Sequence, residues 1–127
     1  DERGADVETK TYKKTLEQGE ELEKLLRTLE REGVSKSEIT ILSPLTFKNS
    51  VAMQLDSVIS ATRSDKHIFF STIQAFKGLE SPVIILTDIE SLDRESQKHL
   101  LYVGMTRAKT LLYILANKTV SKYLIGN

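Results

Sequence analysis

The chain has 127 residues with 18 basic and 18 acidic side chains, so its formal net charge is zero, and it contains no cysteine. A chain of this length is about the size of one ordinary domain, and we expect a single domain over residues 1–127. The absence of cysteine excludes disulfides and thiolate chemistry, and with only two histidines we expect no metal site. The neutral balance gives no overall field that would attract nucleic acid, so any such contact must be local.

The apolar stretches of the chain are short. The longest, such as 83–86 and 100–103, fall far below the roughly 20 residues that cross a bilayer, and the N-terminus lacks the apolar region of a signal peptide. We therefore expect a cytoplasmic protein without membrane contacts. Because the chain does not begin with methionine and ends abruptly, we also expect a fragment of a longer protein.

The first half of the chain predicts two strands and two helices. Residues 7–12 alternate as a short edge strand, and residues 39–42 form a brief β-branched strand. Leucines recur at helical spacing over 16–32, which predicts an amphipathic helix ended by a left-handed glycine. Apolar residues at helical spacing over 51–59 predict a second helix. Two polar residues could cap this second helix: Asn49 and Ser50.

The second half predicts three strands and one helix. Residues 67–73 read as a strand, and 83–87 as a strand covered on both faces, because its apolar run does not alternate. A helix is predicted over 93–109 and a last strand over 111–115. Strands that alternate with helices predict an α/β fold with a mainly parallel sheet and helices on both faces.

The segment "STIQAFKGLE", residues 71–80, follows a predicted strand and contains three residues suited to a nucleotide. Gly78 can adopt a positive φ or let another backbone come close, Lys77 offers a charge to phosphate, and Glu80 can accept hydrogen bonds from sugar hydroxyls. We expect this loop and the stretch 88–94 to lie at the carboxyl ends of the strands, where such folds bind ligands. A tight turn with solvated charges explains the same segment equally well.

The segment "LLYVGMTRAK", residues 100–109, places a glycine and an arginine on an apolar helix. A glycine inside a helix costs about 1 kcal/mol relative to alanine, so a close neighbour of Gly104 must need the space. Arg107, held on a rigid helix, can bind a phosphate through two hydrogen bonds. The alternative is a cation that complements the dipole at the helix C-terminus.

Two further features limit the chemistry of the chain. No phosphate-binding loop of the G-x-x-x-x-G-K-[ST] type and no Gly-x-Gly-x-x-Gly loop occurs, so the chain alone is not expected to hydrolyse ATP. Four carboxylates are close together in sequence, but acidic residues before a helix mostly act as caps and dipole partners rather than as metal ligands. These four are Asp88, Glu90, Asp93 and Glu95.

Taken in this order, the two segments resemble the fifth and sixth motifs of superfamily 1 DNA helicases of the UvrD, Rep and PcrA type. Residues 72–80, TIQAFKGLE, correspond to a family segment like T-x-H-x-x-K-G-L-E, and residues 100–109 to one like L-x-Y-V-x-x-T-R-A-K. The resemblance is clearest over 68–115 and looser from residue 39 onward.

The resemblance implies a three-layer RecA-like fold of the P-loop NTPase type that lacks its own phosphate loop. The chain would be a fragment of the second motor domain of an ATP-dependent DNA helicase, inactive in isolation. ATP with Mg²⁺ would bind in the cleft between this domain and an N-terminal RecA-like domain that supplies the phosphate loop and the Mg²⁺ ligands. Single-stranded DNA would be the other partner.

Carried over position by position, the resemblance assigns roles to seven residues. Arg107 corresponds to the arginine finger and is the catalytic residue of the set. Gly78, Glu80, Thr106 and Arg107 would bind ATP, with Gly78 at the phosphates and Glu80 at the ribose. Thr72, Gln74 and Lys77 would contact DNA or relay the nucleotide state to it.

Three departures from the family pattern leave other interpretations open. Gln74 replaces the usual histidine, Ser81 replaces the usual aromatic residue, and the fourth motif is not recognisable. The first alternative is a non-catalytic helicase-like module that binds DNA or a partner without ATP turnover. The second is an unrelated α/β domain, such as a receiver-like module, with its site at Asp88 and Lys77.

Overall fold

The computed structural model describes residues 5–12, 15–91 and 93–117. In this part of the chain six strands form one sheet, and every pair of neighbouring strands runs parallel. The order across the sheet is β1-β6-β5-β2-β4-β3, which makes β1 and β3 the edge strands. The strands are β1 (Asp6–Tyr12), β2 (Ile39–Ser43), β3 (Ile59–Ser60), β4 (Ile68–Thr72), β5 (Ser81–Leu86) and β6 (Ala108–Asn117).

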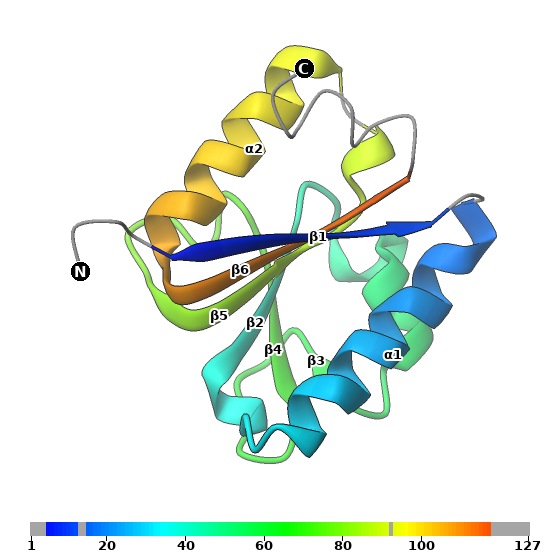
Figure 1. Ribbon diagram of the computed structural model, residues 1–127, viewed down its shortest axis with the longest axis vertical. Helices are drawn as coiled ribbons and strands as arrows, with labels where there is room; N and C mark the ends of the chain where they lie inside the picture. The colour runs from blue at the N-terminus through cyan, green and yellow to red at the C-terminus, as the bar shows by residue number, and fades with distance from the viewer. Residues whose placement is uncertain (1–4, 13–14, 92, 118–127) are drawn as a thin grey trace.

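Two α-helices, α1 (Gln18–Arg31) and α2 (Arg94–Arg107), cover opposite faces of the sheet (Figure 1). The core is accordingly divided in two. Val83 and Ile85 of β5 pack on the α1 side, whereas the alternate residues Ile84 and Leu86 pack on the α2 side. The predicted three-layer α/β fold with a parallel sheet is therefore confirmed. Among the described residues, neither helix is long and apolar enough to cross a membrane.

Helix α1 forms as its leucine spacing predicts. Four leucines at positions 22, 25, 26 and 29 are buried against the sheet, and Arg27 pairs with Glu23 one turn earlier at 2.8 Å. Gly33 ends the helix with φ of +85°, a conformation that other residues adopt only with strain. A 3₁₀ turn over Thr15–Glu17 precedes the helix.

The predicted helix over 51–59 is wrong. Val51–Leu55 forms only a 3₁₀ segment, and Ile59 already belongs to β3. Ser50, one of the two residues predicted to cap this segment, does so: its hydroxyl oxygen accepts a hydrogen bond from the amide of Ala52 at 3.1 Å. The amide of Val51, which would be unpaired at the start of any helix, donates to the buried carboxylate of Asp88 at 3.0 Å. The helical pattern is interrupted further on, where Ile59 pairs with Ile68 of β4.

Helix α2 begins at the predicted position, where Asp93 accepts a hydrogen bond from the amide of Ser96 at 2.7 Å. It ends at Arg107, two residues earlier than predicted, because Ala108 takes an extended backbone and pairs with Ser81 as the first residue of β6. Lys109 is therefore in a strand. Three further 3₁₀ turns occupy Lys36–Glu38, Phe47–Asn49 and Ile89–Ser91.

Gly104 lies where α2 touches the sheet most closely. A Cβ atom added there would lie 3.0 Å from methyl carbons of both Leu86 and Leu112, two fully buried side chains of β5 and β6. The expectation that a close neighbour needs the space is confirmed, and that neighbour is the sheet.

Replacing Gly104 with valine should lower the free energy of unfolding by about 2 kcal/mol, because two buried leucines must move. Lys98→Val, an exposed change on the same helix, should cost about 0.5 kcal/mol or less and controls for helix propensity. Urea denaturation monitored by circular dichroism measures both values. Equal losses for the two variants would show that α2 packs less tightly than this geometry requires.

Candidate functional site

Residues 73–80 form a short crossover connection, which runs from the carboxyl ends of the parallel strands back to their amino ends. It leaves the carboxyl end of β4 after Thr72 and enters the amino end of β5 at Ser81. Because β2 lies between these two strands, the crossover passes over β2. Phe76 anchors it: its ring is 1% exposed and belongs to the core on the α2 side. The predicted site residues of the first motif therefore lie on the same face of the sheet as α2.

A series of turns shapes this crossover. The Thr72 hydroxyl oxygen accepts a hydrogen bond from the amide of Ala75 at 3.2 Å, and the Thr72 carbonyl accepts one from Phe76 at 3.1 Å. The amide of Lys77 donates to the carbonyl of Gln74 at 3.3 Å. The side chains of Gln74 and Lys77 are exposed. Thr72 thus shapes the turn with both its oxygens, while Gln74 and Lys77 project into solvent.

Gly78 has two properties that suit a ligand contact. Its φ is +83°, which glycine adopts without strain. Among the described residues, no heavy atom outside Gly78 and its two chain neighbours lies within 4 Å of the position that a Cβ would occupy. The backbone conformation alone is sufficient to require glycine here. The open space beside it leaves the peptide accessible to another molecule.

Glu80 and Arg107 lie immediately before the first residues of two neighbouring strands, β5 and β6. Glu80 precedes Ser81, Arg107 precedes Ala108, and Ser81 and Ala108 are register partners at the first positions of β5 and β6. The expectation that the whole loop 74–80 lies at the carboxyl ends of the strands is therefore wrong for Glu80. Thr72, beside Ser43, lies at the carboxyl edge, and the crossover carries the chain from there to the amino edge.

Arg107 is a half-buried cation at the last position of α2. Within the described part of the chain its guanidinium has no hydrogen bond and no ion pair. The neighbouring Thr106 is exposed, and its hydroxyl donates to the carbonyl of Val103 at 3.0 Å. Arg107 therefore keeps its hydrogen-bond donors available to a ligand, whereas the Thr106 hydroxyl proton is engaged by its own helix.

Glu80 has one charged neighbour that the sequence did not reveal. Lys109 lies 3.9 Å from its carboxylate, and both side chains are more than half exposed. A pair of this kind contributes between 0 and about 1 kcal/mol, so it orients the carboxylate without blocking it. The contact depends on β6 starting at Ala108, and no periodic pattern in the sequence indicates that start.

The four carboxylates near residue 90 do not form one site. Asp88 is buried, with φ of +62°, and its carboxylate accepts hydrogen bonds from three hydroxyls and one amide. The distances are 2.6 Å to Ser43, 2.6 Å to Ser50, 3.0 Å to Thr87 and 3.0 Å to the amide of Val51. Asp88 holds segments together and is not accessible to a ligand, which argues against a site built on Asp88 and Lys77.

The other three carboxylates also have separate roles. Glu90 accepts hydrogen bonds from the Tyr12 hydroxyl at 2.6 Å and from the Asn117 amide at 3.0 Å. Asp93 caps α2, and the bond from Ser96 lowers the pKa of this carboxyl. Glu95 is exposed in the first turn of α2. Among the described residues no group of three or more acidic or histidine side chains could hold a metal ion.

Residues 67–115 match the family model described as the UvrD-like helicase C-terminal domain, and this range includes both motifs. The resemblance to the UvrD-type helicases is confirmed. The chain is 40% identical over 62 residues to the ATP-dependent DNA helicase srs2 of Schizosaccharomyces pombe, which covers 42% of this chain and 7% of that protein. It is 28% identical over 111 residues to the ATP-dependent DNA helicase PcrA of Bacillus subtilis, covering 78% of this chain and 15% of that protein.

A third relative, the mitochondrial ATP-dependent DNA helicase HMI1 of Saccharomyces cerevisiae, is 46% identical over 44 residues, 35% of this chain and 6% of that protein. The chain thus spans 15% or less of the length of these curated relatives. Among solved structures, the C-terminal domain of a possible DNA helicase from Lactobacillus plantarum has a TM-score of 0.75 at 18% identity. The match covers 97% of this chain and 81% of that one, so the UvrD-like match and the fold agree.

Replacing Asp88 with asparagine should lower the free energy of unfolding by about 2–4 kcal/mol, because four buried donors lose a charged acceptor. Glu95→Gln makes the same chemical change at an exposed site and should stay within about 0.5 kcal/mol. Urea denaturation of both variants is the measurement. If Asp88→Asn lowers the free energy of unfolding by less than 1 kcal/mol, this carboxylate does not hold the surrounding segments together.

The buried Tyr12 hydroxyl predicts a specific response to alkaline pH. Burial, followed by the hydrogen bond to Glu90, raises the pKa of Tyr12 well above its usual value near 10. The neutral phenol is favoured in the folded state, so its stabilising effect is complete below pH 10 and is lost as the pH rises further. By pH 11 this loss reaches about 1.4 kcal/mol.

Tyr12→Phe should therefore cost about 1 kcal/mol at pH 8, where the bond to Glu90 is lost. Its disadvantage should shrink by about 1.4 kcal/mol between pH 8 and pH 11, about 1 kcal/mol of it between pH 10 and pH 11, because the variant has no phenol at this position to ionise. Denaturation midpoints of both proteins at pH 8, 10 and 11 test this. Parallel curves at all three pH values would contradict the assigned role of Tyr12.

Proposed function

We propose that this chain is part of the second motor domain of an ATP-dependent DNA helicase and supplies the arginine finger to an ATP site completed by an N-terminal RecA-like domain. The observation that carries the proposal is the pairing of Ser81 with Ala108. It brings the ends of the two motifs together, so that Glu80 and Arg107 reach one edge of the sheet from adjacent strands.

The residues at this edge fit one half of a nucleotide site. Arg107 offers a guanidinium that has no partner among the described residues, Gly78 leaves its peptide open to a phosphate, and Glu80 presents an exposed carboxylate suited to ribose hydroxyls. Thr106 would contribute to the same side. The described residues contain neither a phosphate loop nor an acidic cluster for Mg²⁺, so both belong to the other domain in this proposal.

Arg107 would act by stabilising negative charge on the transferring phosphoryl group. An arginine finger typically contributes 10³ to 10⁵ in turnover, about 4–7 kcal/mol. Its position at the end of a helix that packs tightly through Gly104 would limit its motion, so that closure of the two domains would bring the guanidinium to the phosphate as a rigid unit. The isolated chain would not hydrolyse ATP.

The other three residues would connect this edge to DNA. Thr72 lies at the carboxyl end of β4, and Gln74 and Lys77 are exposed on the crossover that leads to Glu80. Gln74 can donate and accept hydrogen bonds with a backbone or base, but it cannot carry the positive charge of the family histidine. Lys77 provides the charge for a phosphate contact, which would make binding of single-stranded DNA depend on salt.

The test is the DNA-stimulated ATPase activity of the full-length protein that contains this chain, wild type against Arg107→Ala. Turnover should fall at least a thousand-fold while ATP binding is largely retained. Lys98→Ala, which removes an exposed cation from the same helix, should leave turnover within a factor of two. If Arg107→Ala keeps full turnover, Arg107 is a structural helix end. If the wild-type protein has no ATPase activity, the non-catalytic helicase-like module is the better description.

A further inference from the structure

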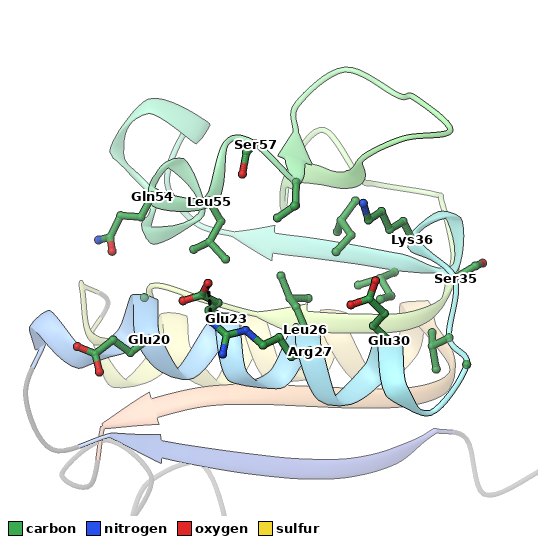
Figure 2. Close-up of a pocket in the computed structure, with 16 residues that line it drawn as sticks. Glu20, Glu23, Leu26, Arg27, Glu30, Ser35, Lys36, Gln54, Leu55 and Ser57 are labelled. Carbon is green, nitrogen blue, oxygen red and sulfur yellow. Dashed lines mark ion pairs between the residues drawn. The ribbon is translucent and has the colours of Figure 1, made fainter.

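A groove of about 650 Å³ runs along α1, on the face of the sheet opposite α2 (Figure 2). Its floor is aliphatic and comes from α1, from the turn after it, from β2 and β4, and from the segment before β3. The floor residues are Leu26, Val34, Ile39, Leu55, Val58 and Ile68. None of the residues assigned to nucleotide or DNA lines this groove.

The groove is open because the segment that borders it is short. Val51–Leu55 forms a 3₁₀ segment where the sequence predicts a longer helix, so within the described part of the chain no second α-helix lies beside α1 on this face. Gly19 lets Gln54 approach α1 closely, since an added Cβ would clash with the Gln54 amide group. The two walls are held together by the core beneath them, because Leu22 of α1 and Val51 and Ala52 of the bordering segment belong to one buried cluster.

The α1 rim of the groove is acidic. Glu20, Glu23 and Glu30 all line it, and Glu23 is paired with Arg27 at 2.8 Å (Figure 2). Within the described residues, Glu20 and Glu30 have no ion pair and no hydrogen bond. They are ten residues apart, which corresponds to about 15 Å along the helix. An apolar floor therefore lies between two free carboxylates.

The wider surface has the same sign. Residues 17–32 contain six acidic and three basic side chains, a net charge of −3. A surface of this charge repels the phosphates of nucleic acid and attracts cations. The binding of an amphipathic helix in a groove uses apolar side chains at i, i+3, i+4 and i+7, which span about 10.5 Å and fit within the roughly 15 Å from Glu20 to Glu30.

We propose that this groove docks an amphipathic helix of a partner protein, with apolar side chains on the groove floor and basic side chains at Glu20 and Glu30. The proposal does not depend on the helicase function, because it uses a different face of the sheet. Lys36 occupies the opposite rim and donates to the carbonyl of Lys66 at 3.4 Å. The basic groups of the partner therefore lie along α1.

The test uses two synthetic 16-residue helical peptides that share one leucine stripe and carry either lysine or glutamate at every polar position. Titration into the ¹⁵N-labelled chain should shift the amides of Leu26, Leu55, Val58 and Ile68 with the lysine peptide. That peptide should bind at least tenfold more tightly than the glutamate peptide. Shifts confined to α2 or to the crossover, or equal binding of both peptides, would overturn the proposal.

Charge-reversal variants localise the effect. Glu20→Lys combined with Glu30→Lys should weaken the lysine peptide at least tenfold, with folding checked by circular dichroism. Glu21→Lys combined with Glu32→Lys changes the charge of the same segment equally, but neither residue lines the groove, and binding should change less than threefold. Equal weakening by both pairs would leave only a general charge effect and overturn the site. A concentration-dependent dimer with the groove amides at its interface would assign the groove to a second copy instead.

Discussion

The buried carboxylate of Asp88 holds together the carboxyl edge of the sheet. It joins the end of β2 through Ser43, the start of the 3₁₀ segment through Ser50 and Val51, and the end of β5 through Thr87. The amide of Asp88 also donates to Gln18 at the start of α1. A carboxylate that is buried away from water is stable only where hydrogen-bond donors surround it. The fold must therefore bring the ends of β2 and β5 and the start of the 3₁₀ segment together around Asp88.

That requirement shapes both faces of the molecule. On the α1 side, the bond from Val51 holds the start of the segment before β3 at the sheet edge, where it forms a 3₁₀ turn and leaves the groove beside α1 open. On the α2 side, β4 and β5 are joined by only eight residues, 73–80, too few for a packed helix across β2. The buried ring of Phe76 anchors this short crossover to the core on the α2 side.

Elements with local signals could be predicted from the sequence. The leucine spacing of α1 reflects burial of one helix face, and the unbroken apolar run of β5 reflects burial on both faces of the strand, so each pattern was sufficient by itself. The helix predicted at 51–59 is wrong because Ile59 pairs with Ile68 of β4, a contact between strands that the local spacing of apolar residues does not reveal. The edge at which Glu80 lies could not be predicted either, since it follows from strand order. The two motifs indicated the family because their chemistry is specific, whereas the roles of Arg107 and Glu80 stay predictions.

The zero net charge of the chain conceals a separation of charge across the sheet. Residues 17–32 carry a net charge of −3, whereas residues 94–109 carry four basic and one acidic side chain, a net charge of +3. The two segments contain α1 and α2, which cover opposite faces (Figure 1). The difference would favour phosphates beside α2 and cations beside α1. Because the sheet lies between the two helices, the proposed DNA site and the proposed helix-binding groove would not overlap, so occupation of one would not block the other.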